Sequence, residues 1–372
     1  MAKRILITGG AGFIGSHLCD FLLEKGFNVR ILDNLSEQVH GKLHVKPSYL
    51  NSFAELMIGD VRDKSAVEKA LKDVDIVYHL AAKVGVGQSM YEIAGYTDTN
   101  NLGTSVLLEG IIQHPVAKLI VASSMSIYGE GLYQTTSGER VPGHTRDIHD
   151  LKKGRWELYN EKGDLLEPVP TPEDKKPSLA SVYALSKYDQ ERLCLIIGRA
   201  YRIPVVALRL FNVYGTRQSL SNPYTGILAI FASRYLNGNP PMIFEDGNQR
   251  RDFVNVKDVV RALVLACEKE DANGEIFNIG SGRSYTINQI ADLLKEIMSL
   301  DDIVPEITRK YRVGDIRHCF SDISKASKIL GFEPKVDIDA GLAELTAWLT
   351  TQRAIDGVET ARKELEKRGL TI

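Results

Sequence analysis

The sequence is poor in cysteine and contains no long apolar run. Its four cysteines, Cys19, Cys194, Cys267 and Cys319, are widely separated and show no C-x-x-C spacing. This pattern excludes a small scaffold held by disulfides and argues against a zinc ribbon, so reduced thiols and no metal site are expected. No stretch approaches the roughly 20 apolar residues that a membrane-spanning helix needs, and the apolar run after Arg4 is too short for a signal peptide. We therefore expect a soluble, cytoplasmic protein that binds no membrane.

An excess of charge of either sign is also missing. The 46 Lys and Arg residues nearly balance the 48 Asp and Glu residues, for a formal net charge of −2. Basic clusters are short, such as Arg250-Arg251, so the sequence lacks the electrostatic signature of a nucleic-acid-binding protein. Hydrophobic residues make up 44% and charged residues 25%, which is typical of a globular protein and excludes a disordered or collagen-like chain.

The first half of the 372-residue chain alternates short β-branched runs with helical patterns. The runs are continuously apolar, as in a parallel sheet that helices cover on both faces. The predicted strands span residues 4–8, 28–33, 54–58, 76–80, 119–123, 205–209 and 275–279. The predicted helices span about 14–25, 65–72, 97–113, 181–201, 256–268, 286–298, 322–330 and 338–353. This order predicts an α/β fold with a Rossmann-type, doubly wound parallel sheet.

Two parts are expected within this fold. Residues 1–211 would form the Rossmann domain, to which residues of about 255–282 return. Residues 212–372 would form mainly a smaller, mixed α/β lobe with C-terminal helices, the last of them a charged, solvated helix after Gln352.

A stretch of about 130–170 is rich in charged and turn-forming residues and indicates an insertion. Within it, residues 155–159 and 165–169 flank a five-residue loop and predict a hairpin.

Three glycines, Gly9, Gly12 and Gly15, follow the first predicted strand at three-residue steps. Between a strand and a helix this spacing is typical of a dinucleotide-binding loop, in which the glycines allow a tight turn, close approach of a pyrophosphate and close helix packing. The pyrophosphate would lie at the helix N-terminus, where Phe13 and Ile14 follow the second glycine. A glycine-rich turn without a ligand is the alternative.

Asp33 ends the second predicted strand, about twenty residues beyond the glycine loop. A carboxylate at this position binds the adenosine ribose diol and repels a 2′-phosphate, and the adjacent Asn34 brings no positive charge. NAD is therefore expected in preference to NADP. The acidic loop with Asp60 and Val61, after the third strand, is placed to meet the adenine edge, although Asp33 could also be a solvated residue at a strand end.

Tyr183 and Lys187 lie four positions apart and share one face of a predicted helix. An ammonium beside a phenol favours the phenolate, so we expect a lowered pKa for Tyr183, which could then act as a general base toward a sugar hydroxyl. The pair alone could be part of a surface helix. It becomes specific together with the glycine loop and with Ser123-Ser124, at the carboxyl end of a predicted strand where ligands bind in parallel sheets.

With these elements the chain resembles the extended short-chain dehydrogenase/reductase family, in particular its NAD-dependent nucleoside-diphosphate-sugar epimerases. The matching segments occur in the family's order and leave out only residues 130–168 and the tail. They are Thr8–Gly15, Asp33-Asn34, Gly59–Val61, His79–Ala82, Asn100 with Gly103-Thr104, Ser123-Ser124, Tyr183, Lys187, Arg209–Gly215, Arg251–Val254, and Arg312 with Gly314-Asp315.

The resemblance implies roles for individual residues. The catalytic residues would be Ser124, Tyr183 and Lys187. The cofactor-binding residues would be Gly9, Gly12, Phe13, Ile14, Gly15, Asp33, Asn34, Asp60, Val61, Leu80, Ala81, Ala82, Asn100, Tyr183 and Lys187. The substrate-binding residues would be Ser124, Ser126, Asn212, Arg251 and Arg312. Asn212 and the two arginines would hold the diphosphate, since a guanidinium can bind phosphate in a bidentate way, although either arginine could instead form a surface ion pair.

The residues at the two positions after the predicted catalytic serine narrow the range of possible reactions. Relatives that resemble 4,6-dehydratases carry an Asp-Glu pair there, and those that decarboxylate UDP-glucuronate carry a glutamate at the second position, whereas this chain has Met125 and Ser126. Without a second acid or base, the site fits a 4-epimerase that oxidises C4 to a ketone and returns the hydride to the opposite face. A dehydrogenase, a reductase or a 4,6-dehydratase remains an alternative, and a non-catalytic NAD-binding sensor is an alternative from another class.

Residues 33–41, 84–90 and 221–226 resemble a subgroup often assigned to dTDP-L-rhamnose 4-epimerisation. The resemblance thus favours dTDP-L-rhamnose and dTDP-6-deoxy-L-talose as substrates, with UDP-glucose or UDP-glucuronate as alternatives. It also implies a homodimer that pairs the helices at 97–113 and 181–201.

In related chains the hairpin of the insertion carries a C-P-x-C-G knuckle, which residues 159–163 lack. No zinc is therefore expected there. The long spacing between Ser124 and Tyr183 places the insertion beside the active site, either as a lid or as a surface ornament.

Overall fold

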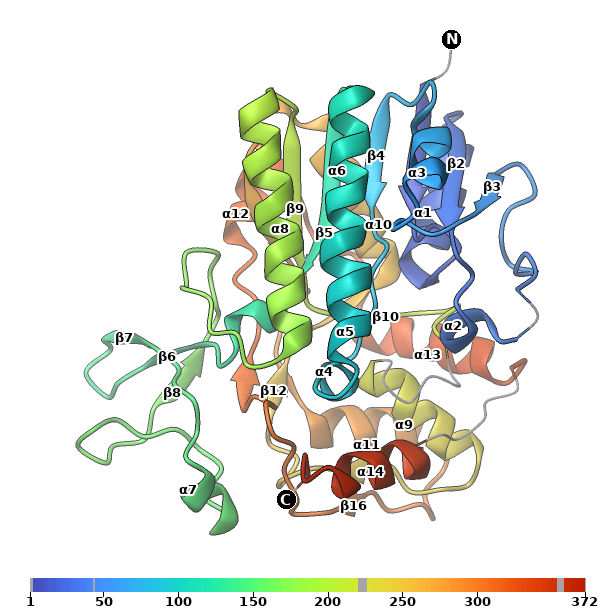
Figure 1. The fold of residues 1–372 in the computed structure, drawn as a ribbon. Coiled ribbons are helices and arrows are strands. Elements are labelled where there is room, and N and C mark those ends of the chain that lie inside the picture. Colours follow the sequence, from blue (N-terminus) through green and yellow to red (C-terminus); the bar gives the residue numbers. More distant parts are fainter. Residues whose placement is uncertain (1–2, 43, 220–225, 353–357, 372) are drawn as a thin grey trace.

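The computed structural model describes residues 3–42, 44–219, 226–352 and 358–371, and its centre is a parallel sheet (Figure 1). The seven strands lie in the order β3-β2-β1-β4-β5-β9-β14. They are β1 (Arg4–Thr8), β2 (Asn28–Asp33), β3 (Glu55–Ile58), β4 (Ile76–His79), β5 (Lys118–Ser124), β9 (Val205–Leu210) and β14 (Ile276–Ile279). The chain winds outward from β1 in both directions, so the predicted Rossmann-type sheet and its strands are confirmed.

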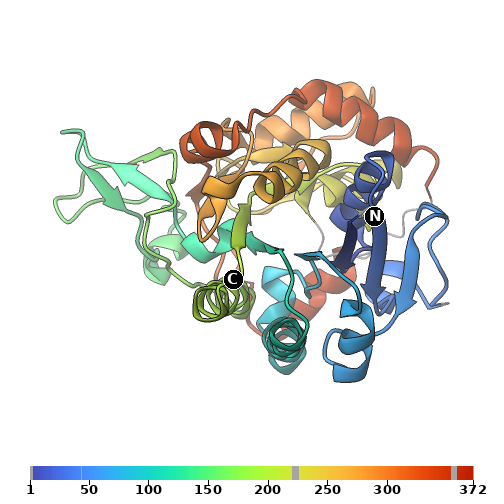
Figure 2. The ribbon, with the colours of Figure 1, turned by 90° about the horizontal axis from the view of Figure 1, so that it is seen from above.

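Helices cover both faces of this sheet, as the view from above shows (Figure 2). One face carries α1 (Phe13–Glu24), α10 (Val256–Glu268) and α12 (Ser324–Leu330). The other carries α3 (Lys64–Leu71), α6 (Gly103–Gln113) and α8 (Val182–Tyr201). The predicted helix over 97–113 is α6 preceded by a π-helical turn, η1 (Thr97–Leu102). Short helices in the connections are α2 (Glu37–His40), α4 (Val86–Ser89), α5 (Ile93–Tyr96), η2 (Met125–Tyr128) and η3 (Glu270–Ala272).

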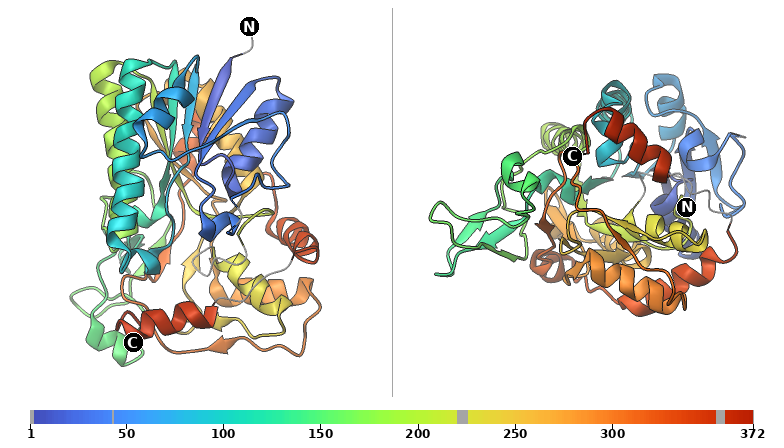
Figure 3. Two further views of the ribbon diagram at one scale, coloured as in Figure 1. Left: turned by 45° about the vertical axis from the view of Figure 1, so that its right-hand side comes forward. Right: turned by 90° about the horizontal axis from the view of Figure 1, so that it is seen from below.

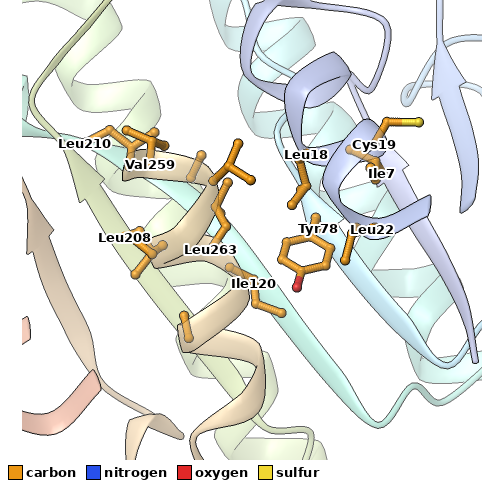
Figure 4. Close-up of a cluster of buried hydrophobic side chains, with 14 of the residues drawn as sticks. Ile7, Leu18, Cys19, Leu22, Tyr78, Ile120, Leu208, Leu210, Val259 and Leu263 are labelled. Carbon is orange, nitrogen blue, oxygen red and sulfur yellow. The ribbon is translucent and has the colours of Figure 1, made fainter. Parts of the chain in front are cut away.

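The two helical layers explain why the strands are continuously apolar. Successive side chains of a strand point to opposite faces, so Ile5 and Ile7 of β1 belong to the core under α1 and α10, whereas Leu6 belongs to the core under α3 and α6. Figure 4 shows the first of these cores, in which Leu18 of α1 and Leu263 of α10 face the sheet. The sheet is therefore fixed on both sides, and the loops at its carboxyl edge start from a rigid frame.

The chain returns to this frame after residue 250. α10 and β14 lie within the range predicted to return, and α12 packs on the same core through Ala326 and Leu330. The return therefore extends further along the chain than about 255–282.

A second lobe has a core of its own, built on three helices. These are α9 (Ile227–Leu236), α11 (Ile287–Ile297) and α13 (Ile338–Leu349). Short strands complete the lobe: β10 (Asn212–Tyr214) beside β13 (Phe253–Asn255), β11 (Met242–Ile243) beside β16 (Glu306–Ile307), and β12 (Arg250–Arg251) between β15 (Tyr285–Thr286) and β17 (His318–Cys319). The helices predicted over 256–268, 286–298, 322–330 and 338–353 are confirmed to within a few residues.

The insertion protrudes from the side of the molecule as a small sheet (Figure 1). It contains β6 (Leu132–Gln134), β7 (Arg140–Pro142), α7 (Ile148–Lys152) and β8 (Glu167–Val169), with β6 between β7 and β8.

The turn of the predicted hairpin forms, with Asn160 N donating to the Asp164 carbonyl at 2.9 Å. The strand predicted over 155–159 is wrong, since its pairing with the second strand is reduced to one bridge at Tyr159 and Leu165. The physical reason is that β8 pairs with β6 instead, and Leu158 and Leu166 pack on Tyr133 of β6 in a small separate core.

Buried ion pairs hold the insertion against the second lobe. Arg146 of the insertion pairs with Glu245 at 2.8 Å, and its side chain is 5% exposed. Arg317 lies 2.9 Å from Glu245 and also pairs with Glu157 of the insertion. Because Arg146, Glu245 and Arg317 are shielded from water, removal of any one of them would leave an uncompensated buried charge.

The tail does not form the predicted solvated helix. α14 (Val358–Lys367) is amphipathic, and Ala361 and Leu365 are buried. In Figure 3 this dark red helix lies at the bottom of the molecule, below the sheet. In the part of the chain that the structure describes, no helix is both long and apolar enough to cross a bilayer.

Candidate active site

The glycine loop connects β1 to α1, which begins at Phe13 and Ile14. Gly9 has φ +71°, and a Cβ there would lie 2.8 Å from the Ala81 backbone. A Cβ at Gly15 would lie 2.5 Å from the Gly9 carbonyl oxygen, so both positions require glycine for local packing.

Gly12 differs from the other two glycines. A Cβ there would meet no described atom closer than 3.4 Å, and Gly12 caps α1 without a side-chain hydrogen bond. The space beside it and the first amides of α1 are therefore suited to the pyrophosphate of a dinucleotide.

Asp33 lies at the carboxyl end of β2, next to this loop. Its Oδ2 accepts a hydrogen bond from Ala11 N at 3.0 Å, and its Oδ1 accepts one from Leu35 N at 2.9 Å. The carboxylate is thus fixed between the glycine loop and the chain that leaves β2. A carboxylate oxygen has a second lone pair, so both oxygens can still accept a hydroxyl donor.

Asn34 and Asp60, both predicted to meet the cofactor, lie in contact. Asn34 Nδ2 donates to Asp60 Oδ2 at 2.8 Å, and Arg62 N donates to Asp60 Oδ1 at 2.9 Å. Burial opposes ionisation of Asp60, but hydrogen bonds from Arg62 and Asn34 outweigh it and lower its pKa to about 2. Val61 is buried beneath Gly103, where a Cβ would lie 2.6 Å from its side chain.

The loop after β4, with Leu80, Ala81 and Ala82, is positioned by Asn100. This fully buried side chain accepts from Lys83 N at 2.8 Å and donates to Ser186 Oγ of α8 at 2.9 Å. Its amide therefore fixes the loop to α8, a positioning role for a residue that was predicted to bind the cofactor.

Ser124 and Tyr183 come together where β5 ends and α8 begins. Ser181 caps α8 by accepting from Ala184 N at 3.1 Å, which places Tyr183 in the first turn. The Tyr183 hydroxyl is hydrogen-bonded to Ser124. Ser124 Oγ lies 2.8 Å from Ser126 Oγ, so two serines and the phenol form one hydroxyl cluster.

The predicted lowering of the Tyr183 pKa is wrong for this structure. Burial raises the pKa, and the hydrogen bond with Ser124 only partly opposes it. Burial is the physical reason, and the Lys187 ammonium does not offset it but donates to Gln190 Oε1 at 2.6 Å. Burial also lowers the pKa of Lys187 to about 8, with the charges of Cys194 and Glu191 acting against it.

Gln190 is a residue that the sequence analysis missed. It connects Lys187 to Thr104, whose Oγ1 accepts from Gln190 Nε2 at 2.8 Å, and His79 joins the same cluster. Burial lowers the pKa of His79 to about 3, and the charge of Lys187 acts in the same direction. The spacing of three residues from Lys187 on one helix was the available signal.

A cavity of about 300 Å³ opens between the two lobes. Four of the predicted substrate residues line it: Ser126, Asn212, Arg251 and Arg312. Its other walls come from α4, η2, α9, β11 and α14. Asn212 Oδ1, Gln249 Oε1 and the Nε atoms of Arg312 and Arg362 are buried in these walls without a hydrogen-bond partner among the described residues. Such atoms indicate a polar ligand.

Asp315 lies between the two predicted arginines. Its Oδ1 is 3.5 Å from Arg251 Nη2, and its Oδ2 is 3.2 Å from Arg312 Nη2. Burial opposes its ionisation, but the charges of Arg312 and Arg251 outweigh burial and lower its pKa. Arg251 also donates to the Ile316 carbonyl at 2.6 Å. Neither arginine is a freely solvated surface residue.

The insertion and the tail differ in their relation to the cavity. No described residue of 130–170 lines the cavity, whereas Val358, Ala361, Arg362 and Leu365 of α14 do. This favours the interpretation of the insertion as a surface ornament over its interpretation as a lid. It also shows that residues of the tail form part of the cavity wall. Residues 221–225, part of the subgroup resemblance, lie outside the described residues.

Comparisons with known proteins agree with this architecture. Residues 5–280 match the family described as NAD dependent epimerase/dehydratase. A dTDP-L-rhamnose 4-epimerase of Burkholderia thailandensis is 34% identical over 359 residues, which cover 94% of this chain and 96% of that protein. A UDP-N-acetyl-alpha-D-glucosaminuronate decarboxylase of Bacillus cytotoxicus is 31% identical, over 94% of this chain and 98% of that protein.

Solved structures are similar as well. A UDP-glucose 4-epimerase of Thermotoga maritima with UDP-glucose is 36% identical with a TM-score of 0.76, over 94% of this chain and 99% of that one. A UDP-glucuronic acid 4-epimerase of Bacillus cereus, in complex with UDP-glucuronic acid and NAD, is 29% identical with a TM-score of 0.77 and the same coverage. The chain therefore belongs to the NAD-dependent epimerase/dehydratase family and is an NAD-dependent isomerase.

Proposed function

We propose that the protein is a 4-epimerase of a nucleoside-diphosphate sugar and that its substrates are dTDP-L-rhamnose and dTDP-6-deoxy-L-talose. The observation that supports epimerisation over elimination or decarboxylation is the small set of charged groups around the cavity. Asp315 is the carboxylate among the described lining residues, and two arginines engage it. Met125 and Ser126 offer no second acid or base beside Ser124, which elimination or decarboxylation would use.

The hydroxyl cluster supplies the proton chemistry of this proposal. Tyr183 takes the proton of the C4 hydroxyl as the general base, and Ser124 holds that hydroxyl by a hydrogen bond. NAD, when bound, accepts the hydride of C4 and returns it to either face of the ketone. Lys187 stays largely protonated at neutral pH because its pKa is about 8. In this structure its ammonium donates to Gln190, and the proposal requires that it turn toward Tyr183 when NAD and substrate are bound, where its charge stabilises the phenolate that burial disfavours.

The second lobe would hold the nucleotide while the sugar turns over. Asn212, Arg251 and Arg312 line the cavity at a distance in sequence from the catalytic residues. In this proposal, residues 1–211 and the returning segments bind NAD, and the rest of residues 212–372 binds the nucleoside diphosphate. An anchor at the diphosphate leaves the 4-keto sugar free to present either face.

Two observations support the 6-deoxy sugar. The Burkholderia relative that is 34% identical is named a dTDP-L-rhamnose 4-epimerase. The cavity that Ser126 lines also has apolar lining residues from the first domain, Val86, Gly87 and Met125, which suit a methyl group at C5 better than a carboxylate. UDP-glucose and UDP-glucuronate are the alternatives.

A panel of sugar nucleotides tests the proposal. The holoenzyme is incubated with dTDP-L-rhamnose, UDP-glucose, UDP-glucuronate and their 4-epimers, the products are identified by NMR, and absorbance of NADH is followed in parallel. We expect interconversion of the dTDP-L-rhamnose pair without net NADH. Formation of stoichiometric NADH would indicate a dehydrogenase. Loss of water would indicate a dehydratase, and loss of CO2 would indicate a decarboxylase. If no sugar nucleotide is converted, the protein is a non-catalytic NAD-binding sensor.

Asp33→Ala is expected to weaken NAD binding by about ten- to hundredfold and to reduce the preference for NAD over NADP, because charge-assisted hydrogen bonds to the ribose are lost. Titration of the apoenzyme with both cofactors measures this. Glu37→Ala removes the same charge four residues away and serves as the control. An unchanged preference in Asp33→Ala would show that Asp33 does not meet the ribose.

The proposal includes a homodimer. Leu102 of η1 and Leu185 and Ile196 of α8 are exposed large apolar side chains on neighbouring helices. A second copy of the chain would cover such a surface, as the family resemblance implies.

A further inference from the structure

Helix α14 forms one wall of the cavity between the lobes. Val358, Ala361, Arg362 and Leu365 contribute to that wall. Seen from below, α14 extends across the space between the two lobes (Figure 3). The tail therefore belongs to the substrate cavity.

Contacts at both ends fix α14 in this place. At its start, Glu359 Oε1 lies 3.7 Å from Arg234 Nη1 of α9, in the second lobe. Beyond its end, the guanidinium of Arg368 lies 4.3 Å from the ring centroid of Tyr91, which follows α4 in the first domain. The helix thus bridges the two lobes.

The apolar face of α14 determines which side chains point inward. Ala361 and Leu365 are buried. The Cδ atoms of Leu365 lie 3.5 Å from the position that a Cβ on Gly87 would take, an ordinary van der Waals distance, so the leucine packs on α4 at Gly87. This packing sets the rotation of α14 about its axis.

Arg362 lies on the cavity side of this helix. Its Nε is buried and has no hydrogen-bond partner among the described residues. The nearest carboxylate oxygens, on Glu359 and Glu366, are each 3.6 Å away, and both of these acids pair with other cations, Arg234 and Lys310. Among the described residues, the guanidinium of Arg362 therefore has two ion pairs of 3.6 Å, each with an acid that it shares with another cation, and no hydrogen bond through Nε.

The charge balance of the cavity favours an anionic ligand. Among the described lining residues, the charged side chains are those of Arg251, Arg312, Arg362 and Asp315, three cations and one carboxylate. The Nε atoms of Arg312 and Arg362 make no hydrogen bond to a described residue. A diphosphate carries two negative charges and several acceptor oxygens, and guanidinium groups bind such oxygens well.

We propose, on the basis of the nucleotide-sugar function above, that Arg362 is a third arginine that binds the diphosphate of the substrate. The diphosphate is then held from the second lobe by Arg251 and Arg312 and from α14 by Arg362. Because Arg362 acts on the anchor and touches no reacting atom, it contributes to affinity for the nucleotide and leaves the rate at saturation unchanged.

Calorimetric titration of the NAD-bound enzyme with dTDP and UDP tests this inference. We expect Arg362→Gln to weaken binding of the nucleoside diphosphate by about tenfold or more, to raise the KM of the sugar nucleotide similarly and to leave kcat unchanged. Arg362→Lys retains the charge and is expected to recover part of the affinity. Lys363→Gln is the matched control, since it removes the same charge from the solvent-exposed side of α14.

The outcomes separate this inference from the proposed function. If Arg312→Gln weakens binding while Arg362→Gln behaves like Lys363→Gln, the role of Arg362 is wrong and the function stands. A fall in kcat with unchanged affinity for dTDP also overturns the role of Arg362. If the wild-type holoenzyme binds neither dTDP nor UDP, the proposed function itself is wrong.

Discussion

Tyr183→Phe is expected to lower kcat by about two to four orders of magnitude, the usual contribution of a general acid or base. The change removes only the hydroxyl that bonds to Ser124. The ring can keep its edge-to-face contact with Tyr96, at 6.4 Å between centroids, so the fold and the bound NAD should be retained. Turnover of the 4-epimer pair, followed by NMR, and the NAD content of the purified variant measure the two parts of this result.

Tyr188→Phe is the control for Tyr183→Phe. Tyr188 lies on the same helix and packs on a small core with Ile127 and Phe211, outside the residues that line the cavity. We expect a rate near that of the wild type. A rate near wild type in Tyr183→Phe as well would remove Tyr183 from the mechanism, and loss of NAD from that variant would point to a cofactor-binding role instead.

Arg317→Met is expected to lower the free energy of unfolding by about 3–5 kcal/mol, the usual cost of removing one partner from a buried charge cluster. The Arg317 side chain is 1% exposed and pairs with Glu245 at 2.9 Å and with Asp246 at 2.6 Å. It also donates to Glu157 of the insertion at 2.9 Å. Without the guanidinium, these carboxylates remain close together and only partly hydrated.

The loss in Arg317→Met is expected to shrink at acidic pH. Burial opposes ionisation of Glu157, but hydrogen bonds from His318 and Arg317 outweigh it and lower its pKa from 4.5 to about 2. This lowered pKa stabilises the wild type fully above about pH 4.5 and less as the pH falls toward 2. In the variant, Glu157 loses the hydrogen bond and the charge of Arg317 that lower its pKa, so it is protonated more readily as the pH falls. Its protonation relieves the repulsion between the carboxylates, and the two proteins become more alike.

Urea denaturation at pH 7 and at pH 4 measures both effects of Arg317→Met. Arg283→Met is the control, because the pair of Arg283 with Asp337 is more than half exposed on both sides and is expected to contribute less than about 1 kcal/mol. Equal losses in the two variants would mean that the buried cluster does not hold the insertion.

Several parts of the site could be predicted because they depend on residues close in sequence. Gly15 of the first loop, for example, is required by a clash within that loop, since a Cβ there would lie 2.5 Å from the Gly9 carbonyl oxygen. Tyr183 and Lys187 share a helix face by the geometry of the helix alone. The apolar strands were recognisable because a strand covered on both faces needs no polar alternation.

The pKa of Tyr183 could not be predicted in this way. Spacing places Lys187 on the same face, but the direction of its ammonium depends on Gln190, which in turn bonds to Thr104 on another helix. Burial then determines the direction of the shift. A pKa depends on the whole surroundings of a group, and sequence spacing gives only one neighbour.

The tail shows the same limit. Val358, Ala361 and Leu365 recur at helical spacing, so an amphipathic helix was recognisable. The sequence did not show which surface the apolar side of this helix would meet, because that surface is formed by Gly87 and by loops from both lobes.

The sequence by itself determined the Rossmann-type sheet, the dinucleotide loop and the candidate catalytic residues, because periodicity, glycine spacing and helix geometry act between near neighbours in the chain. Only the tertiary structure decided that β8 pairs with β6 and that α14 forms a wall of the cavity beside Arg251 and Arg312. Those outcomes depend on which apolar faces and charges meet across the two lobes, and packing between distant segments is decided by the folded chain as a whole.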